Sequence, residues 1–505
     1  MDSATSRLRK LQGILEAAQA LVAERDLDRL LPLIVQTAAR TVEADRCSLF
    51  LVDHQKGELW SKVAQGLGVR EIRFPMDRGI AGAVAKHNKI ENIPDAYDDA
   101  RFNRDFDKQT GYRTRAILCV PMRSLDGEVV GVLQALNKVG GASGEHLGVF
   151  SAEDEELLMA LGGQAAAAVN NALLHQEIER LFEGFVRASV VAIEARDPTT
   201  AGHSGRVANL SVGLGEILPR AEASAGRWRG SILSSQELQE LRYASLLHDF
   251  GKVGVRENVL VKANKLEPFE LDALKARFDA ILLQEELGFE RRKVAHLLAN
   301  HLDRAGFDAI EEEYKRRVAE LTESFNFVLG CNKPTILPEG TFDRLGVIAK
   351  AQYLSAASGE LRPFLTDNEV LKLSVRKGSL TEDERREIES HVSHTFRFLT
   401  QIPWTRALKR VPEIAYGHHE KLTGKGYPRA LSEPEISLPT RMMTISDIYD
   451  ALTASDRPYK KAVPKQKAFD ILLDEAKKGD VDQDLLRVFI EADVPTRSAQ
   501  PQSAP

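Results

Sequence analysis

Cysteine is scarce in this chain of 505 residues, which contains three, at Cys47, Cys119 and Cys331. They stand far apart and form no close pair, so the sequence indicates neither a disulfide framework nor a cysteine-ligated zinc site. We expect buried free thiols instead. The remaining composition, with 43% hydrophobic and 28% charged residues, is that of an ordinary globular protein.

Long apolar runs and surplus positive charge are also missing. No stretch is read as long enough to span a membrane, and the N-terminus lacks the hydrophobic core of a secretion signal, so we expect a cytoplasmic protein without a membrane partner. The net charge of −6 argues against a surface that binds nucleic-acid polymers. The length predicts two or three domains.

The N-terminal third alternates between helical and strand patterns. Apolar residues recur at helical spacing from Leu8 to about Val42, and a short helix is expected from Gly79. Strands are expected at 47–53, 116–121 and 129–137, and one long helix at 151–195. This order predicts a single α/β sensor domain.

Three motifs give this region its resemblance to a known family. They are Asn-Ile-Pro-Asp-Ala-Tyr…Arg-Phe-Asn at 92–103, Thr-Gly-Tyr-Arg-Thr-Arg at 110–115, and Asn137-Lys138 followed by Phe150, Asp154 and Glu155. The region resembles a GAF domain of the cyclic-nucleotide phosphodiesterase type. The resemblance implies that the third motif holds the fold over a cyclic AMP or cyclic GMP ligand. It also implies that the ligand faces Ser48, Ala81, Asp107, Thr110, Thr114 and Gln134.

Other interpretations of this region stay open. Ser151 is a good N-cap and carboxylates favour the first turn of a helix, which alone would explain Asp154 and Glu155 but not Asn137 and Lys138. A GAF domain that binds another ligand, or that serves only in dimerisation, is the alternative.

A connecting helix follows the sensor. Its apolar positions have a 4-3-4-3-4 spacing typical of a two-stranded coiled coil, at Leu174, Ile178, Leu181, Phe185, Ala188 and Ala192. We expect a homodimer through this helix, although a buried helix of a monomer would show the same pattern.

Histidines and aspartates gather in motifs of the C-terminal part. His248-Asp249-Phe-Gly-Lys252 ends an apolar run, His418-His419-Glu leads into Gly-Lys-Gly-Tyr427-Pro, and Asp447 opens Asp-Ile-Tyr-Asp. Imidazole mixed with carboxylate, without thiolate, suits iron, manganese or zinc at a catalytic site.

These motifs, together with Arg457-Pro-Tyr-Lys460, resemble the HD-GYP domain, the metal-dependent branch of the HD superfamily that hydrolyses cyclic di-GMP. The resemblance implies two divalent cations, with iron or manganese expected and zinc, magnesium, nickel or cobalt as alternatives. It implies the metal ligands His203, His248, Asp249, His391, His418, His419 and Asp447. Asp249 would bridge the ions and Lys252 would neutralise the scissile phosphate, while Tyr427, Arg457 and Lys460 would contact the substrate.

The chain departs from the family pattern in three places. An insertion at about 265–374 interrupts it, and its His296 and His301 are interpreted as surface or packing histidines. Thr381 and Glu384 form a capping box that begins a helix carrying His391, with His394 expected in the surroundings of the site or in solvent. Thr199 stands where some members hold a third metal with glutamate, and Thr423 replaces an acidic residue.

The sequence therefore predicts a multidomain chain. An α/β GAF sensor with an antiparallel sheet (1–172) is followed by a coiled-coil helix (173–196), an all-α HD-GYP domain with its insertion (197–490) and a disordered tail (491–505). The expected function is hydrolysis of cyclic di-GMP to pGpG, and possibly GMP, under control of the sensor. A phosphohydrolase acting on another cyclic dinucleotide or nucleotide, and a non-catalytic signalling scaffold, are the alternatives.

Overall fold

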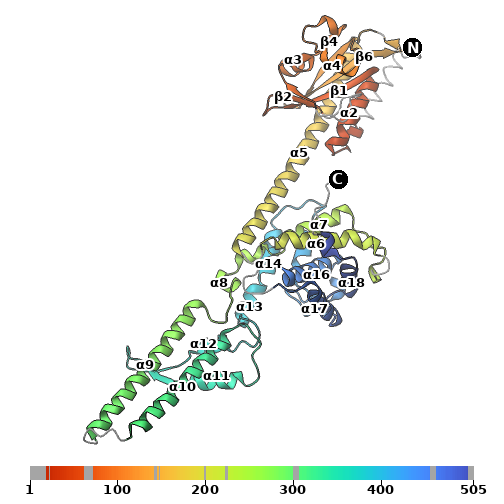
Figure 1. Cartoon of the computed structure of the whole chain (residues 1–505). Coiled ribbons are helices and arrows are strands. Elements are labelled where there is room, and N and C mark those ends of the chain that lie inside the picture. Colours follow the sequence, from red (N-terminus) through yellow and green to blue (C-terminus); the bar gives the residue numbers. More distant parts are fainter. Residues whose placement is uncertain are drawn as a thin grey trace. The chain divides into compact units, whose positions relative to one another are not determined.

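The computed structural model describes residues 19–61 apart from position 22, 72–140, 145–146, 148–197, 201–221, 226–299, 306–454 and 462–498. The chain divides into two compact units, Met1–Gly184 and Phe185–Pro505 (Figure 1). The first is an α/β unit with an antiparallel sheet and the second is mostly helical. The predicted fold class is confirmed.

The sheet of the first unit has the strand order β3-β2-β1-β6-β5-β4, with β7 paired to β6. The strands are β1 (Ala44–Asp53), β2 (Glu58–Ser61), β3 (Ile72–Pro75), β4 (Glu91–Ile93), β5 (Ile117–Arg123), β6 (Val129–Gly140) and β7 (Glu145–His146). All pairings are antiparallel, and the register sets Ser48 of β1 beside Gln134 of β6. The predicted strands at 47–53, 116–121 and 129–137 correspond to β1, β5 and β6.

Helices cover both faces of this sheet. One hydrophobic core lies between the sheet and the helices α2 (Leu27–Thr41) and α5 (Ala152–Arg196), and includes Ile34 and Leu161. A second core, on the side of α3 (Gly79–His87), includes Ile80 and Val84. The 3-10 turn Ala96–Asp98 and α4 (Asp105–Thr110) complete the unit.

The predicted continuous helix from Leu8 to Val42 is wrong in its described part. Residues 24–26 are not helical, and α2 begins after Asp26, whose side chain accepts a hydrogen bond from the backbone N–H of Asp28 as an N-cap. Residues 1–18 lie outside the described part of the chain.

Helix α5 corrects the prediction that no stretch is apolar and long enough to span a membrane. It contains a window of mean hydropathy 1.4, long and apolar enough by length and composition to cross a membrane. Half of that window is buried in the fold, and buried core helices pass the same test. Its apolar character has a structural cause, because Leu157, Leu158, Leu161 and Val169 pack into the core beside the sheet.

The second unit is a helical assembly around α16. Its helices are α6 (His203–Ile217), α7 (Ser235–Leu247), α13 (Glu382–Glu389), α14 (His391–Leu399), α15 (Val411–Tyr416), α16 (Leu438–Thr453), α17 (Lys465–Lys477), α18 (Gln483–Glu491) and α19 (Val494–Ser498). Short 3-10 segments lie at Leu218–Arg220, Gly226–Trp228, Phe250–Gly254 and Glu433–Glu435. The Thr381 capping box is present, but α13 ends at Glu389 and a new helix starts at His391.

The insertion builds a hydrophobic core of its own, which runs from Leu266 to Leu373. Helix α8 (Glu257–Leu260) precedes the insertion, whose elements are α9 (Pro268–Ala299), α10 (Phe307–Asn332), α11 (Thr341–Lys350), the strands β8 (Gln352–Leu354) and β9 (Leu361–Pro363), and α12 (Asp367–Leu373). In Figure 1, α9 and α10 lie side by side as a long hairpin.

The prediction of a disordered tail is wrong for residues 491–498. Helix α19 packs against α6, and its Val494 is fully buried. The apolar contact explains why this Pro- and Ser-containing segment is ordered. Residues 499–505 lie outside the described part.

Candidate functional site

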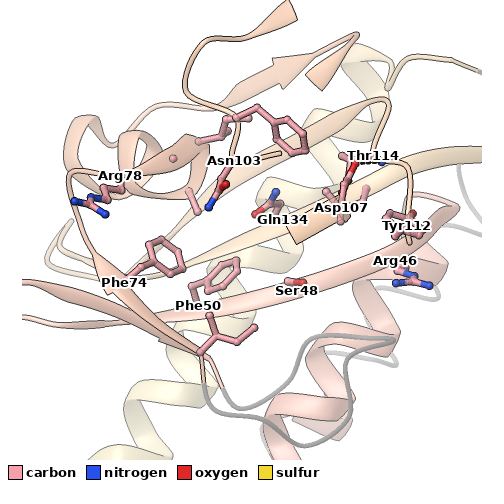
Figure 2. A pocket seen from close by; sticks show the side chains of 16 residues that line it. Arg46, Ser48, Phe50, Phe74, Arg78, Asn103, Asp107, Tyr112, Thr114 and Gln134 are labelled. Atoms are coloured by element: carbon pink, nitrogen blue, oxygen red, sulfur yellow. Dashed lines mark hydrogen bonds between the residues drawn. The ribbon is translucent and has the colours of Figure 1, made fainter. Parts of the chain in front are cut away.

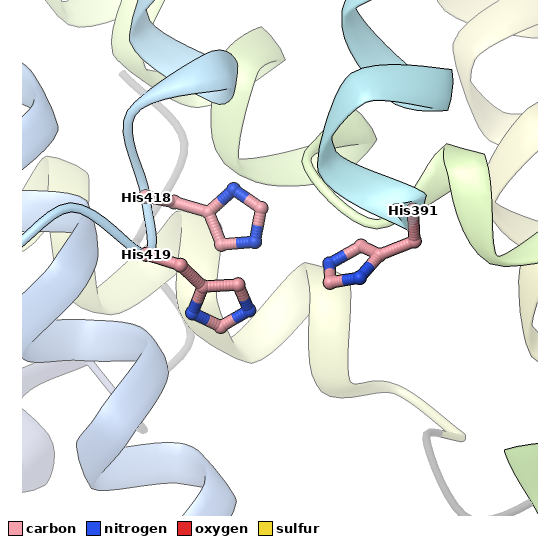
Figure 3. A group of neighbouring side chains, drawn as sticks. All are labelled: His391, His418 and His419. Atoms are coloured by element: carbon pink, nitrogen blue, oxygen red, sulfur yellow. The ribbon is translucent and has the colours of Figure 1, made fainter. Parts of the chain in front are cut away.

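Seven side chains converge in the second unit from both sides of the insertion. His203 begins α6, His248 and Asp249 follow α7, His391 begins α14, His418 and His419 follow α15, and Asp447 lies within α16. Their ligand atoms form three groups, each within 4.8 Å: His391, His418 and His419; His203, His248 and Asp249; and His248, His418 and Asp447. Figure 3 shows His391 of α14 facing the pair after α15.

Three of the imidazoles are held in one tautomer by the backbone. The Nδ1 atoms of His248, His391 and His418 lie 2.7, 2.6 and 2.6 Å from the carbonyl oxygens of the residues three positions earlier. A carbonyl only accepts, so each Nδ1 carries the proton and each Nε2 keeps a free lone pair. These three Nε2 atoms are buried and, among the described residues, have no hydrogen-bond partner.

Burial favours the neutral state of His248, His418 and His419. It lowers the pKa of His248 and lowers that of His418 well below the ordinary value, in the latter case helped by the neighbouring imidazoles. It also lowers the pKa of His419 to about 4. Neutral imidazoles with unpaired lone pairs can bind metal ions. A buried nitrogen atom that has neither a hydrogen-bond partner nor a metal ion lowers the stability of the fold.

Asp249 lies between the two histidine groups. Its Oδ1 is 3.2 Å from Nε2 of His391, whereas its Oδ2 is 3.4 Å from Nε2 of His248 and 3.8 Å from Nε2 of His203. Burial would raise the pKa of this carboxyl, but Lys252, His248 and His391 lower it well below its usual range. One ionised carboxylate therefore offers an oxygen to each side.

His203 is oriented by a carboxylate that the sequence interpretation missed. Its Nδ1 lies 2.7 Å from Oδ2 of Asp450, and its Nε2 lies 3.2 Å from Oδ1 of Asp447. Burial lowers the pKa of His203, but hydrogen bonds to these two aspartates outweigh it and raise the pKa to about 9. Arg206 in turn holds Asp450, with Nε 2.7 Å from its Oδ1.

Lys252 is placed between two carboxylates. Its Nζ lies 2.8 Å from Oδ2 of Asp249 and 3.4 Å from Oδ2 of Asp197, the residue that follows α5. Burial lowers the pKa of Lys252, but the two aspartates raise it by more, so the net pKa is above the ordinary value and the ammonium stays charged beside the ligand cluster.

Two glycines allow the close approaches that build the site. A Cβ on Gly251 would lie 1.9 Å from the carbonyl oxygen of His391 and 2.5 Å from the backbone nitrogen of Thr395. A Cβ on Gly426 would lie 2.3 Å from the backbone nitrogen of Lys421. The first brings the start of α14 onto the turn after Asp249, and the second folds the 421–428 loop onto itself.

The loop places Tyr427 at the edge of the site. Its ring centroid is 4.8 Å from that of His419, and its backbone N–H donates to the carbonyl oxygen of His419 over 3.2 Å. Glu420 fixes the far side of the loop by accepting from the backbone N–H groups of Arg429 and Leu431. Thr423, the departure from the family pattern, donates to Asp480 over 2.6 Å.

The remaining predicted residues of this unit fall elsewhere. Arg457, Lys460 and His301 lie outside the described residues. His394 packs against Gly254, where a Cβ would meet its Nδ1 at 2.4 Å, and it is not in the ligand groups found among the described residues. His296 lies on α9, with its ring 5.7 Å from that of Phe307.

The first unit contains a cavity of about 270 Å³ between the sheet and α3 (Figure 2). Its walls include five of the six residues predicted to face a ligand, namely Ser48, Ala81, Asp107, Thr114 and Gln134. The side chain of the sixth, Thr110, lies outside the described part. Phe50 and Phe74 add an aromatic wall, with ring centroids 5.2 Å apart, and Arg46 and Arg78 add positive charge.

The Asn137-Lys138 motif holds this cavity together. Asn137, at φ 55°, donates through Nδ2 to Tyr112 and to the carbonyl oxygen of Arg113, and its Oδ1 accepts from the N–H of Arg115. Lys138 is buried with its Nζ 2.7 Å from Oδ1 of Asp154.

The start of α5 is tied to the sheet by the other motif residues. Asn92 of β4 donates to Oε1 of Glu155 over 2.8 Å and to the carbonyl oxygen of Phe150, whose side chain is in the core. Within this wall, Thr114 donates to Asp107 through both its backbone N–H and its hydroxyl. Through the hydrogen bonds of Asn137, the motif holds in place the segment that lines the cavity.

Comparison with known families assigns both units. The GAF domain family matches residues 26–169, and HD domain families match residues 200–323 and 366–485. The chain carries a GAF domain followed by an HD domain. Because side chains from both HD matches meet at Asp249, the two matched segments contribute to one centre.

Relatives with known names match only part of the chain. It is 39% identical over 171 residues to the dual 3′,5′-cyclic-AMP and -GMP phosphodiesterase 11A of Takifugu rubripes, covering 32% of this chain and 18% of that protein. It is 34% identical over 189 residues to the probable 3′,5′-cyclic phosphodiesterase pde-5 of Caenorhabditis elegans, covering 35% and 25%. The chain thus spans a quarter or less of the length of these two relatives.

Among solved structures, the chain is similar to the GAF domain of a phosphoenolpyruvate-protein phosphotransferase from Coxiella burnetii. The two are 24% identical, with 34% of this chain and 98% of that chain covered and a TM-score of 0.30. A likeness of this strength carries no functional argument.

Three residues that the sequence analysis did not single out contact residues of the HD centre. Asp450 is one helical turn after Asp447, so the Asp-Ile-Tyr-Asp pattern could have revealed it. Asp197 and Thr395, whose hydroxyl donates to the carbonyl oxygen of His248, had no comparable signal.

Proposed function

We propose that the HD domain is a metal-dependent phosphodiesterase of the HD-GYP type that hydrolyses cyclic di-GMP to pGpG, and onward to GMP. The GAF domain regulates it. The observation that carries this proposal is the position of Asp249, with one carboxylate oxygen toward His391 and the other toward His203 and His248. A carboxylate so placed can bridge two cations, as two-metal phosphodiester hydrolysis requires.

The donor set fits divalent cations. Three buried Nε2 atoms have no hydrogen-bond partner among the described residues, and two carboxylates share their space. His203, His248, Asp249 and Asp447 would hold one ion, and Asp249, His391, His418 and His419 the other, with iron or manganese favoured by the mixture of imidazole and carboxylate. Bound cations supply Lewis-acid chemistry, which makes water more acidic and withdraws charge from phosphate oxygens.

The protein's own groups complete the reaction. Lys252 lies beside Asp249, where its ammonium can neutralise a phosphodiester oxygen as charge develops on it. Water adds to phosphorus, the bond to the 3′ oxygen breaks, and that oxygen takes up a proton, which opens the ring to a linear dinucleotide. Asp450 holds His203 in orientation.

The 418–428 segment supports the choice of cyclic di-GMP. It matches the HD-GYP pattern, and its fold sets Tyr427 against the ligand His419, so a substrate entering there meets an aromatic side chain beside the ions. The predicted substrate contacts Arg457 and Lys460 stay a proposal.

Product analysis tests the activity. Protein purified without oxygen and loaded with Mn²⁺ or Fe²⁺ is incubated with cyclic di-GMP, and chromatography follows pGpG and GMP. We expect turnover that is lost in the Asp249→Ala and His248→Ala variants and kept in Asp470→Asn, which alters an exposed carboxylate on α17. Lack of turnover in the loaded protein would contradict the proposal and favour a signalling scaffold, which would keep its cellular effect in both alanine variants.

A second candidate substrate is a 3′,5′-cyclic mononucleotide. The names of the matched relatives favour it, although the match covers about a third of the chain. The same assay run with cyclic AMP, cyclic GMP and another cyclic dinucleotide separates these substrates, because the metal ligands do not select the base.

For the GAF cavity we propose cyclic AMP or cyclic GMP as the ligand. A cavity of about 270 Å³ lies just below the usual range of roughly 300–1,000 Å³ for drug-sized ligands, which suits one nucleotide better than two. The Phe50–Phe74 wall can contact a base, and Arg46 and Arg78 can pair with a phosphate. Calorimetric titration tests this: Gln134→Ala and Arg78→Ala should weaken binding, whereas Arg29→Ala on the outer surface of α2 should not.

A further inference from the structure

Helix α9 of the insertion has two apolar faces. The inner face packs against α10 and the insertion core through Leu274, Phe278, Ile281 and Phe289, all of which are buried. The helix has 32 residues, so it is roughly 48 Å long at about 1.5 Å per residue. The inner contacts therefore account for one side of a long rod.

The outer face is an exposed stripe along the whole helix. We call it the α9 seam, and it consists of Phe269, Ala273, Ala276, Ala280, Leu283, Leu287, Val294 and Leu298. Phe269 is 72% exposed, Leu283 63%, Leu287 51%, Val294 54% and Leu298 75%. The spacing alternates between four and three residues up to Leu287, which is the pattern of a helix covered by another helix.

The sizes of the seam residues favour an antiparallel partner. Apart from Phe269 at the start of the helix, the N-terminal half carries the small Ala273, Ala276 and Ala280, and the C-terminal half carries the large Leu287, Val294 and Leu298. A parallel pair of such helices would set alanine against alanine and leave a gap. An antiparallel pair sets the alanines of one helix against the large side chains of the other, and leaves Phe269 and Leu298 to meet at the two ends.

The seam is nearly symmetric about Leu283. Phe269 lies 14 residues before it and Leu298 15 after, so an antiparallel pair with its two-fold axis at Leu283 brings these two together. Ala273 and Val294, 10 before and 11 after, also meet. A surface that is complementary to itself in this way is what a two-fold interface requires.

Charged residues on one edge of the seam follow the same symmetry. Asp272 lies 11 residues before Leu283 and Lys293 10 after, while Lys275 lies 8 before and Glu290 7 after. Within one chain Lys275 pairs with Asp272 over 3.1 Å and Lys293 pairs with Glu290 over 3.2 Å. The antiparallel arrangement sets each pair against the opposite pair, positive charge facing negative.

We propose that the α9 seam binds the α9 seam of a second copy of this chain, antiparallel, about a two-fold axis at Leu283. The insertion is then a dimerisation module of the HD domain. This interface is separate from the predicted pairing of α5 and does not depend on the enzymatic activity.

Cysteine cross-linking tests the arrangement in the full chain. The three native cysteines are buried, so their background is low. Under mild copper–phenanthroline oxidation, Leu283→Cys should form a disulfide-linked dimer by itself because it lies on the axis. Leu298→Cys should not cross-link alone, but should do so when Phe269→Cys is present in the same chain. Glu286→Cys, exposed but nearer the edge of the seam, is the matched control and should cross-link less than Leu283→Cys.

The outcomes separate the possible arrangements. Cross-linking of Leu298→Cys alone, as efficient as that of Leu283→Cys, would indicate a parallel pair and overturn the proposal. Lack of cross-linking at Leu283→Cys would show that a second copy does not cover this face. A dimer that persists through α5 would not bring the two copies of Leu283 together, so its presence does not imitate the expected result. Charge reversal adds a check: Lys275→Glu should reduce the yield from Leu283→Cys several-fold, and adding Glu290→Lys should restore it.

Discussion

At the scale of single residues, four of the five histidines of the centre have a hydrogen-bond partner at Nδ1. His248, His391 and His418 use backbone carbonyls, which any residue can supply, whereas His203 uses the side chain of Asp450. Partners of this kind fix both ring orientation and tautomer. Asp450 is therefore the one such partner among these four that a point substitution can remove.

We expect Asp450→Asn to weaken divalent-cation binding by about 10- to 100-fold, the usual effect of losing such a partner. The amide cannot stabilise the imidazole as the carboxylate does, and Arg206 loses its ion pair at the same time. Competition with a chromogenic chelator measures the affinity, with Asp470→Asn as control. An unchanged affinity would show that His203 does not depend on Asp450.

Gly251 gives a second prediction at this scale. In the Gly251→Ala variant the new Cβ meets the backbone at His391 and Thr395, which cannot move as a side chain can. We expect a loss of about 1–3 kcal/mol in the free energy of unfolding, together with a lower cation content, because His391 is displaced from Asp249.

Denaturant unfolding and metal analysis measure both effects of that change. Gly346→Ala, on α11 with open space around its Cβ position, is the control and should raise stability by up to about 1 kcal/mol, because alanine favours a helix, while it leaves the cation content unchanged. A Gly251→Ala variant as stable as the parent would mean that α14 can shift away from the turn without cost.

At the scale of elements, α5 joins two kinds of helix in one continuous run. Its first half is buried in the GAF core, and its later apolar residues Leu174, Ile178, Leu181 and Phe185 are all exposed. The residues buried in the C-terminal stretch are others, Val186 and Ile193. Phe185 stacks on Phe398 of the same chain, with ring centroids 6.5 Å apart, whereas Leu174, Ile178 and Leu181 are the exposed positions at which we expect a second copy to pack.

We expect Leu181→Cys to cross-link under mild oxidation, because a parallel, in-register pair of α5 helices places the two copies of this residue together. Glu179→Cys, exposed on another side of the helix, should not. Equal cross-linking of the two variants would argue against a defined seam. Cross-linking of neither would leave the homodimer without support from this helix.

The sequence was informative where chemistry needs a particular side chain, and less so where packing decides. Asp249 and the histidines could be predicted because ligand types recur in motifs, and the walls of the GAF cavity could be placed by resemblance. The start of α2 after Asp26 and the start of α14 after Ser390 were not predicted from the periodicity of apolar residues. The outer seam of α9 becomes visible only once the structure shows which face is buried.

At the scale of the whole molecule, the two units have separate cores and separate candidate sites. All seven predicted metal ligands lie in the second unit, beyond Gly184. Two units with their own cores should give two unfolding transitions. A cation bound only to the folded HD domain should therefore stabilise one transition and leave the other unchanged.

Metal removal tests this division in the full chain. We expect a chelator to lower the temperature of the calorimetric transition of the HD domain and to leave the GAF transition in place. If the free cation had been at a hundred times its Kd, the free energy of unfolding of the HD domain should fall by about 2.7 kcal/mol. Cyclic GMP or cyclic AMP should raise the temperature of the GAF transition, because a bound ligand stabilises the folded domain. The His418→Ala variant, which lacks one of the buried ligands, should show a reduced response to the chelator. If the chelator moved the GAF transition as much as the HD transition, either the ions would not reside where the histidines converge or the two units would not unfold independently. The His418→Ala variant separates these explanations, because its response to the chelator is reduced only if the histidine cluster binds the ions.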